Sequence, residues 1–149
     1  MLKVEDILEM WKKDAAIDPR DLTESSINSA RLHAKYLELL TTSRLMLKQT
    51  EMKQKILLRD KWLWYNGKLE KHLIDDYGWP YDPFNGLTKP LKSDLGYFYE
   101  SDEDLQRSEA KIQYIKATIE TLESIMTNLT WRHQNIRNII EWERMTTHT

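Results

Sequence analysis

Apolar residues recur at alternating intervals of three and four along the C-terminal third of the chain, from Ile112 to Ile140. This spacing places one apolar row along a helix and is typical of helices that pack against other helices. His133 is the single polar residue in the row. The pattern leaves open whether the row packs within the chain or also against other copies. The predicted core or oligomer seam consists of Ile112, Ile115, Ile119, Leu122, Met126, Leu129, Ile136 and Ile140.

Helix-breaking residues are concentrated in one part of the chain. All four glycines and three of the four prolines lie between residues 67 and 96, so the flanking segments are expected to be helical. Asp18-Pro19 and Ser101–Asp104 resemble helix starts, and Asn66-Gly67 is a suitable helix end. We predict helices over about 4–14, 20–65 and 102–144, with a connector over 66–101.

These elements predict an all-α fold, with a single helical domain over residues 1–149. A short N-terminal helix would accompany a long antiparallel helical hairpin whose connector is rich in aromatic residues. The connector either clamps onto the hairpin or offers its rings to a partner protein. Apolar residues of the 20–65 helix, such as Ile56, Leu57 and Leu63, point in several directions around its axis. Such a helix must be covered on more than one side, which favours a homo-oligomer.

Charge is unevenly distributed in a chain whose net charge is only −2. Eight basic residues but only three acidic ones lie between Arg44 and Lys71, interleaved with Trp62, Trp64 and Tyr65. Cations that pair with phosphates and rings that stack on unpaired bases are typical of single-stranded nucleic-acid binding, although basic helices also bind acidic proteins. The candidate DNA-binding residues are Arg44, Lys48, Lys55, Arg59, Lys61, Trp62 and Lys68.

The two tryptophans of this segment cannot serve the same surface. Trp62 shares a helical stripe with Lys48, Lys55 and Arg59, whereas Trp64 points roughly 160° away, on the side of Leu57. We expect Trp62 to accompany the cations and Trp64 to pack in the core, although the sequence leaves open whether Trp64 and Tyr65 stack on DNA instead.

Motifs for catalysis are missing from the sequence. Four glycines confined to the connector allow neither a phosphate-binding loop nor a dinucleotide fingerprint. The four histidines lack the spacing of metal ligands, and the chain contains no cysteine. No apolar run approaches the ~20 residues needed to span a bilayer. We therefore expect no enzymatic activity, no metal, no cofactor and no membrane partner.

Three segments carry a resemblance to a known family: VEDILEMWKKDAAID at the start, LHAKYLELL in the long helix, and LRDKWLWYNGK at its end. Together they resemble the UvsY-type recombination mediators of T4-like phages. The resemblance implies a helical homo-oligomeric ring that binds single-stranded DNA and acts in DNA recombination and repair in the cytoplasm of the infected bacterial host. It also implies two protein partners, the phage recombinase and the single-stranded-DNA-binding protein.

The family's DNA-binding motif falls on Leu58–Trp62, so the resemblance implies phosphate contacts by Arg59 and Lys61. Asp60 departs from the motif by placing a negative charge between them. The predicted function is that of a non-enzymatic mediator that promotes loading of the recombinase onto coated single-stranded DNA. The alternative is a structural coiled-coil adaptor whose basic helix binds an acidic protein.

Overall fold

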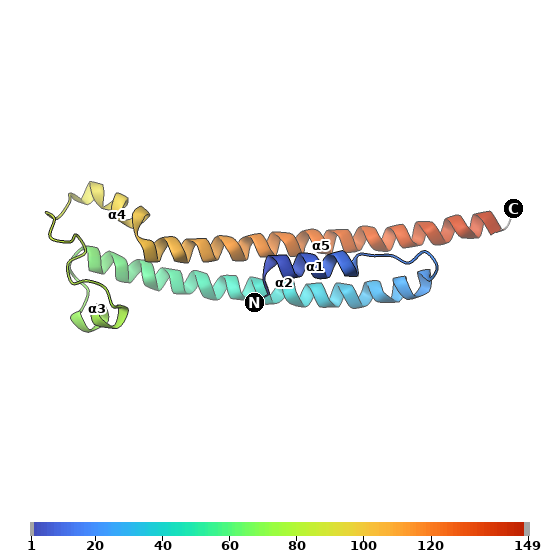
Figure 1. Cartoon of the computed structure of the whole chain (residues 1–149), viewed down its shortest axis with the longest axis horizontal. Helices are drawn as coiled ribbons and strands as arrows, with labels where there is room; N and C mark the ends of the chain where they lie inside the picture. The colour runs from blue at the N-terminus through green and yellow to red at the C-terminus, as the bar shows by residue number, and fades with distance from the viewer. Residues whose placement is uncertain (1, 148–149) are drawn as a thin grey trace. The chain divides into compact units, whose positions relative to one another are not determined.

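The computed structural model describes residues 2–147, and all regular structure in that range is helical (Figure 1). The all-α prediction is confirmed. Two short helices and a 3₁₀ turn lie in the segment predicted as a connector. The elements are α1 (Val4–Asp14), α2 (Leu22–Tyr65), α3 (Lys71–Tyr77), η1 (Lys92–Asp94), α4 (Leu95–Ser101) and α5 (Glu103–Thr147).

Local capping chemistry explains where the long helices begin and end. The Asp18 carboxylate accepts the N–H of Arg20 in a turn, and Asp21 then caps α2 by accepting the N–H of Glu24. The helix therefore starts two residues later than the predicted 20. At its other end, Gly67 adopts φ +70° and the Lys68 N–H bonds to the Leu63 carbonyl at 2.7 Å. This Schellman geometry confirms Asn66-Gly67 as the helix end.

The chain divides into two compact units, Met1–Leu47 with Tyr114–Thr149, and Lys48–Gln113. We call them the first unit and the second unit. The first contains α1, the N-terminal half of α2 and most of α5. The second contains the remainder of both long helices together with α3, η1 and α4 (Figure 1).

An aliphatic core holds the first unit together. Ile115, Leu122, Leu129 and Ile136 are buried at intervals of seven residues along α5. Leu32, Tyr36 and Leu40 of α2 pack against members of this row, and Ile7 of α1 joins the same cluster. Burying aliphatic side chains against one another is the main source of stability for such helical packing.

The predicted seam changes face toward the C-terminal end of α5. Its row Ile112, Ile119, Met126 becomes progressively less buried, and its continuation, His133 and Ile140, lies on the surface of the single chain. These two residues are therefore not part of the core of the single chain, and a place in a seam between copies stays a prediction. A neighbouring row is buried instead, and it consists of Thr118, Ile125 and Arg132.

Contacts of α1 explain the change of face. The Val4 N–H bonds to the Tyr114 hydroxyl at 2.9 Å, and Arg132 donates to the Ala16 carbonyl at 3.2 Å. The contact of Val4, in α1, and that of Ala16, just after it, hold this part of the chain against α5 on the side of Thr118 and Ile125. Figure 1 shows α1 beside the long helices. The Arg132 guanidinium also bonds to Ser29 at 2.7 Å, so it is enclosed with polar partners.

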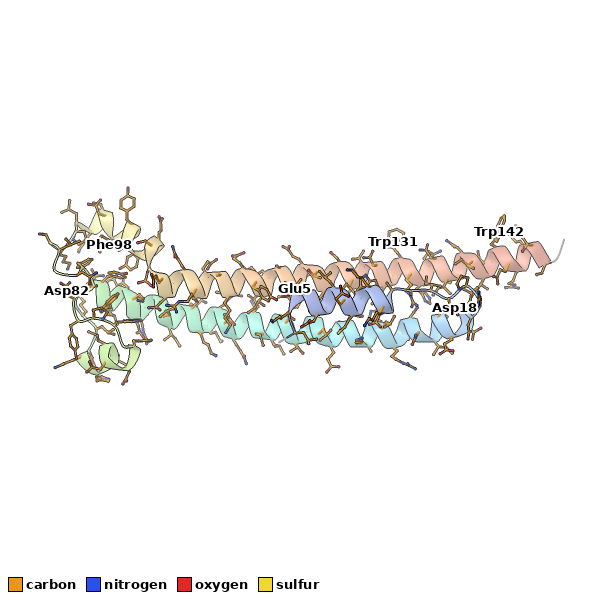
Figure 2. The ribbon with its side chains drawn as sticks, in the orientation of Figure 1. Glu5, Asp18, Asp82, Phe98, Trp131 and Trp142 are labelled. Carbon is orange, nitrogen blue, oxygen red and sulfur yellow. The ribbon has the colours of Figure 1, made fainter. Side chains whose placement is uncertain are left out.

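Aromatic residues form the core of the second unit. Trp64 and Tyr65, at the end of α2, pack with Phe84, Ile74 and Leu95 from the connector. The Trp64 indole N–H donates to the Pro80 carbonyl at 2.8 Å. Both α2 rings are thus core residues, which settles the choice between packing and DNA stacking for them. Phe98 of α4, labelled in Figure 2, contacts Phe84 edge to face.

Candidate nucleic-acid interface

Residues 58–62, the segment LRDKW, are divided between the surface and the interior of the second unit. The Arg59 side chain is 65% exposed and Trp62 is 47% exposed, whereas the Asp60 and Lys61 side chains are 4% and 3% exposed. Successive residues of a helix point about 100° apart, so a helix with one covered side separates them in this way. Only part of the predicted basic motif faces solvent.

Lys61 is a buried residue and not the surface cation that the sequence suggested. Its ammonium pairs with Asp102 at 3.0 Å and with Asp104 at 2.8 Å. The same Nζ atom lies 3.8 Å from the centroid of the Trp79 ring and 4.4 Å from that of Trp64. Two carboxylates and two ring faces occupy the surroundings of this charge. The expectation that Lys61 contacts phosphate does not fit this burial.

Asp102 connects three parts of the second unit. One carboxylate oxygen caps α5 by accepting the Leu105 N–H at 3.0 Å, and the other accepts the Tyr65 hydroxyl at 2.6 Å and pairs with Lys61. Burial alone would raise the pKa of Asp102, but the hydrogen bonds from Tyr65, Leu105 and Lys61 hold this pKa below its ordinary value. Burial and the hydrogen bond to Asp102 raise the pKa of Tyr65.

Asp60 is also neutralised within the protein. It accepts the Arg59 Nε–H at 3.0 Å and the hydroxyl of Tyr77, whose ring stacks on Trp79 with centroids 4.0 Å apart. Burial and the bond to Asp60 raise the pKa of Tyr77 to about 12. The negative charge that interrupts the motif in the sequence is therefore directed into the second unit.

Four cations of α2 are exposed in the second unit: Lys48, Lys53, Lys55 and Arg59. Three of them, Lys48, Lys55 and Arg59, share a stripe with Trp62. Lys48 and Lys55 form no ion pair with any residue in the described range. Arg44 belongs to the first unit, where its guanidinium pairs with Glu123 at 3.1 Å and both side chains are about half exposed. We call Lys48, Lys55, Arg59 and Trp62 the α2 stripe.

A hollow adjoins the end of the α2 stripe. Its volume is about 450 Å³. The Lys68 ammonium lies 5.3 Å from the centroid of the Trp62 ring at this hollow. We call it the Trp62 hollow, and its lining consists of Trp62, Asn66, Lys68, Lys89, Lys92, Leu95, Gly96 and Tyr99.

Sequence reasoning identified Trp62 and Lys68 but missed Lys89, Lys92 and Tyr99. The spacing of two lysines around Pro90 and Leu91 carried no recognisable motif. Their nearness to Trp62 depends on the fold of the connector, which brings residues 89–99 back beside the end of α2. The local concentration of cations is consequently higher than the α2 sequence indicates.

Other kinds of site receive no support from the described residues. Within residues 2–147, no group of three or more His, Cys, Asp or Glu side chains is arranged to hold a metal ion. None of the helices in that range is both long enough and apolar enough to cross a bilayer.

Comparisons with known proteins add a family and a fold. A family model described as "Recombination, repair and ssDNA binding protein UvsY" matches residues 10–148. Two crystal structures of the bacteriophage T4 recombination mediator protein UvsY are similar, with TM-scores of 0.80 and 0.79 and sequence identities of 18% and 17%. The first match covers 99% of both chains, and the second covers 97% of this chain and 99% of the other. At such identities the structures establish the fold. A search of curated protein sequences finds no match.

Proposed function

This chain belongs to the UvsY family, and from that membership we propose that it is a non-enzymatic recombination mediator that binds single-stranded DNA. The observation that carries the proposal is the α2 stripe, where Lys48 and Lys55 are exposed and unpaired among the described residues and Trp62 presents half of its ring to solvent. Free ammonium groups attract phosphates, and an exposed ring stacks on unpaired bases.

The mediator role has two further parts. The protein promotes loading of the phage recombinase onto DNA covered by the single-stranded-DNA-binding protein, in the cytoplasm of the infected host. It acts as a homo-oligomeric ring, so that stripes on several subunits hold one strand. Exposed apolar residues support the assembly: Met52 and Ile56 on α2 in the second unit, and Trp131 and Trp142 on α5 in the first, the last two visible in Figure 2.

Salt titration of DNA binding tests the proposal. Each phosphate neutralised on a single strand contributes about −0.7 to the slope of log K against log salt. We expect a steep slope for the unmodified protein with oligothymidylate, and a shallower slope with weaker binding for the double variant Lys48→Ala/Lys55→Ala. Lys111→Ala/Lys116→Ala removes two exposed lysines of α5 and serves as the matched control.

The outcomes separate a DNA-binding protein from an adaptor for an acidic protein. An adaptor would show no complex with oligothymidylate at moderate salt, and that result would overturn the proposal. Equal losses for the two double variants would show that binding follows total charge and does not depend on the α2 stripe. Native mass measured with and without oligothymidylate tests the ring.

A further inference from the structure

We propose that the Trp62 hollow is a subsite for one unpaired nucleobase, with Trp62 as the stacking ring and Lys68, Lys89 and Lys92 as contacts for the flanking phosphates. The inference rests on the proposed function and goes further, because it assigns base contact to one place and adds connector residues to the DNA surface. A subsite of this kind would make the protein discriminate between single strands and duplexes.

The walls of the hollow are held by contacts within the second unit. The Asn66 side-chain amide donates to the Trp62 carbonyl at 2.7 Å and to the Tyr99 hydroxyl at 3.4 Å. The Tyr99 ring in turn packs edge to face on the buried Tyr65, with centroids 5.2 Å apart. Because these contacts already hold the Tyr99 side chain in place, it loses little additional conformational freedom when a ligand binds. Volumes of this order are usual for sites that enclose a small ligand or one part of a larger one.

Charge in the hollow has one sign. Lys68, Lys89 and Lys92 are exposed, and none of them forms an ion pair with any residue in the described range. The lining contains no carboxylate. Buried Lys61, by contrast, takes two carboxylates in the same unit. Three cations left without ion-pair partners beside an exposed ring fit a ligand that carries negative charge and a flat aromatic group.

A nucleotide within a single strand has both features, and its phosphates lie on either side of the base. Duplex DNA offers the same phosphates but keeps its bases paired and stacked, so it cannot place a base face on Trp62. An acidic peptide would pair with the lysines but would leave the Trp62 ring without a matching partner unless it also carried an aromatic residue. The ring therefore favours a nucleobase.

An abasic oligonucleotide separates contacts to bases from contacts to phosphates. We would measure the affinity of the full chain for oligothymidylate and for an abasic strand of equal length. If one base stacks on Trp62, the unmodified protein should prefer oligothymidylate by about 5- to 150-fold. Trp62→Ala should lose most of that preference, whereas Trp62→Phe should keep much of it. Tyr97→Ala, which removes an exposed ring of α4 outside the hollow, should leave the preference unchanged.

The connector lysines give a second, independent readout. Lys89→Ala/Lys92→Ala should weaken binding to both strands by the same factor and make the salt slope shallower by roughly 0.7 for each phosphate that is no longer neutralised. A photoreactive 5-iodouracil in the strand should crosslink to peptides containing Trp62 or Tyr99. Circular dichroism of each variant confirms that a loss of affinity is not a loss of helix.

Three results would overturn the inference. A preference for bases that survives Trp62→Ala in a folded protein would place base contact elsewhere. Equal, steeply salt-dependent binding of both strands by the unmodified protein would overturn the base subsite while leaving the proposed DNA binding intact. Failure to bind either strand would overturn the proposed function as well.

Discussion

The two units stabilise the same pair of helices with different chemistry. In the first unit, Ile115, Leu122 and Leu129 of α5 meet leucines of α2 in an aliphatic seam, and the polar groups inside it are mainly hydroxyls and one arginine. In the second unit, aromatic rings lie around a buried pair, Lys61 and Asp102, and the partly exposed Asp104 completes the ion cluster. An aliphatic seam tolerates the exchange of one apolar residue for another as long as their spacing and total volume are kept. A buried ion cluster requires particular partners, because an unpaired charge inside a protein is very costly.

The difference also decides which charges remain for a ligand. One side of the α2 end is covered by the connector, which supplies rings such as Trp79, and by the start of α5, which supplies the carboxylates of Asp102 and Asp104. Arg59, which directly precedes the buried Asp60 and Lys61 in the sequence, lies at the surface. The basic segment thus has an internal structural half and an external half, and variants of each half can test that division.

The largest expected effect comes from breaking the buried cluster. Lys61→Ala leaves the buried Asp102 without its cation, whereas Asp104 keeps its pair with Arg107, and the variant should be destabilised by about 3–5 kcal/mol. Chemical denaturation of the variant and of the unmodified protein measures the loss. Lys61→Met combined with Asp102→Asn should recover part of it, because no charge is then stranded beside the Trp64 and Trp79 rings. A Lys61→Ala variant that keeps its stability and loses only DNA binding would contradict the structural role.

The aliphatic seam should respond to loss of volume. Leu122 has no exposed surface, so Leu122→Ala should cost about 2–5 kcal/mol through reduced burial and the cavity left behind. Ile140→Ala, at an exposed position of the predicted seam, should change stability by less than about 0.5 kcal/mol in thermal unfolding. A large effect of Ile140→Ala together with a lower native mass would show that this end of α5 is buried between copies.

Acid should weaken the second unit through Asp102. Its pKa is lowered in the folded protein from 3.8, so the unfolded chain binds the proton more readily. The stabilisation is present above that value and is lost as pH falls through the folded pKa. Between about pH 5 and pH 2, the unmodified protein should lose more stability than Asp102→Asn, as measured by denaturation at each pH. Identical losses in the two proteins would exclude a contribution from Asp102.

Arg59→Ala should have a small effect on stability. The Arg59 guanidinium is mostly exposed and therefore screened by solvent, and Asp60 keeps the hydrogen bond from the Tyr77 hydroxyl when Arg59 is removed. We expect a change below about 1 kcal/mol in stability, combined with weaker single-strand binding. Comparison of this variant with the single variant Lys61→Ala distinguishes the exposed half of the motif from the buried half. If Arg59→Ala unfolds the protein and leaves affinity unchanged in the folded fraction, the assignment of the two halves is reversed.

The sequence by itself determined the helices and much of the seam. Their ends depend on local chemistry, such as the left-handed Gly67 and the aspartates that cap α2 and α5, and local chemistry can be recognised from neighbouring residues. Three-four spacing likewise selected six residues of α5 that are buried in the structure, but it did not select the buried Thr118 and Ile125. The six are Ile112, Ile115, Ile119, Leu122, Leu129 and Ile136. The sequence also located the basic segment, since composition does not depend on packing.

Tertiary structure decided the environment of each charge. Lys61 and Arg59 are similar in sequence terms, but Asp102 and Asp104, distant from both in the chain, pair with the first in the interior and leave the second exposed. Arg132 is buried, whereas the predicted seam residue His133 is exposed, because α1 lies along the Arg132 side of α5. The chain that follows α1 supplies the Ala16 carbonyl, which accepts a hydrogen bond from the Arg132 guanidinium. The lysines of the Trp62 hollow came together only through the fold of the connector. Burial of a charge depends on partners brought from distant parts of the chain, and periodicity along one helix does not contain that information.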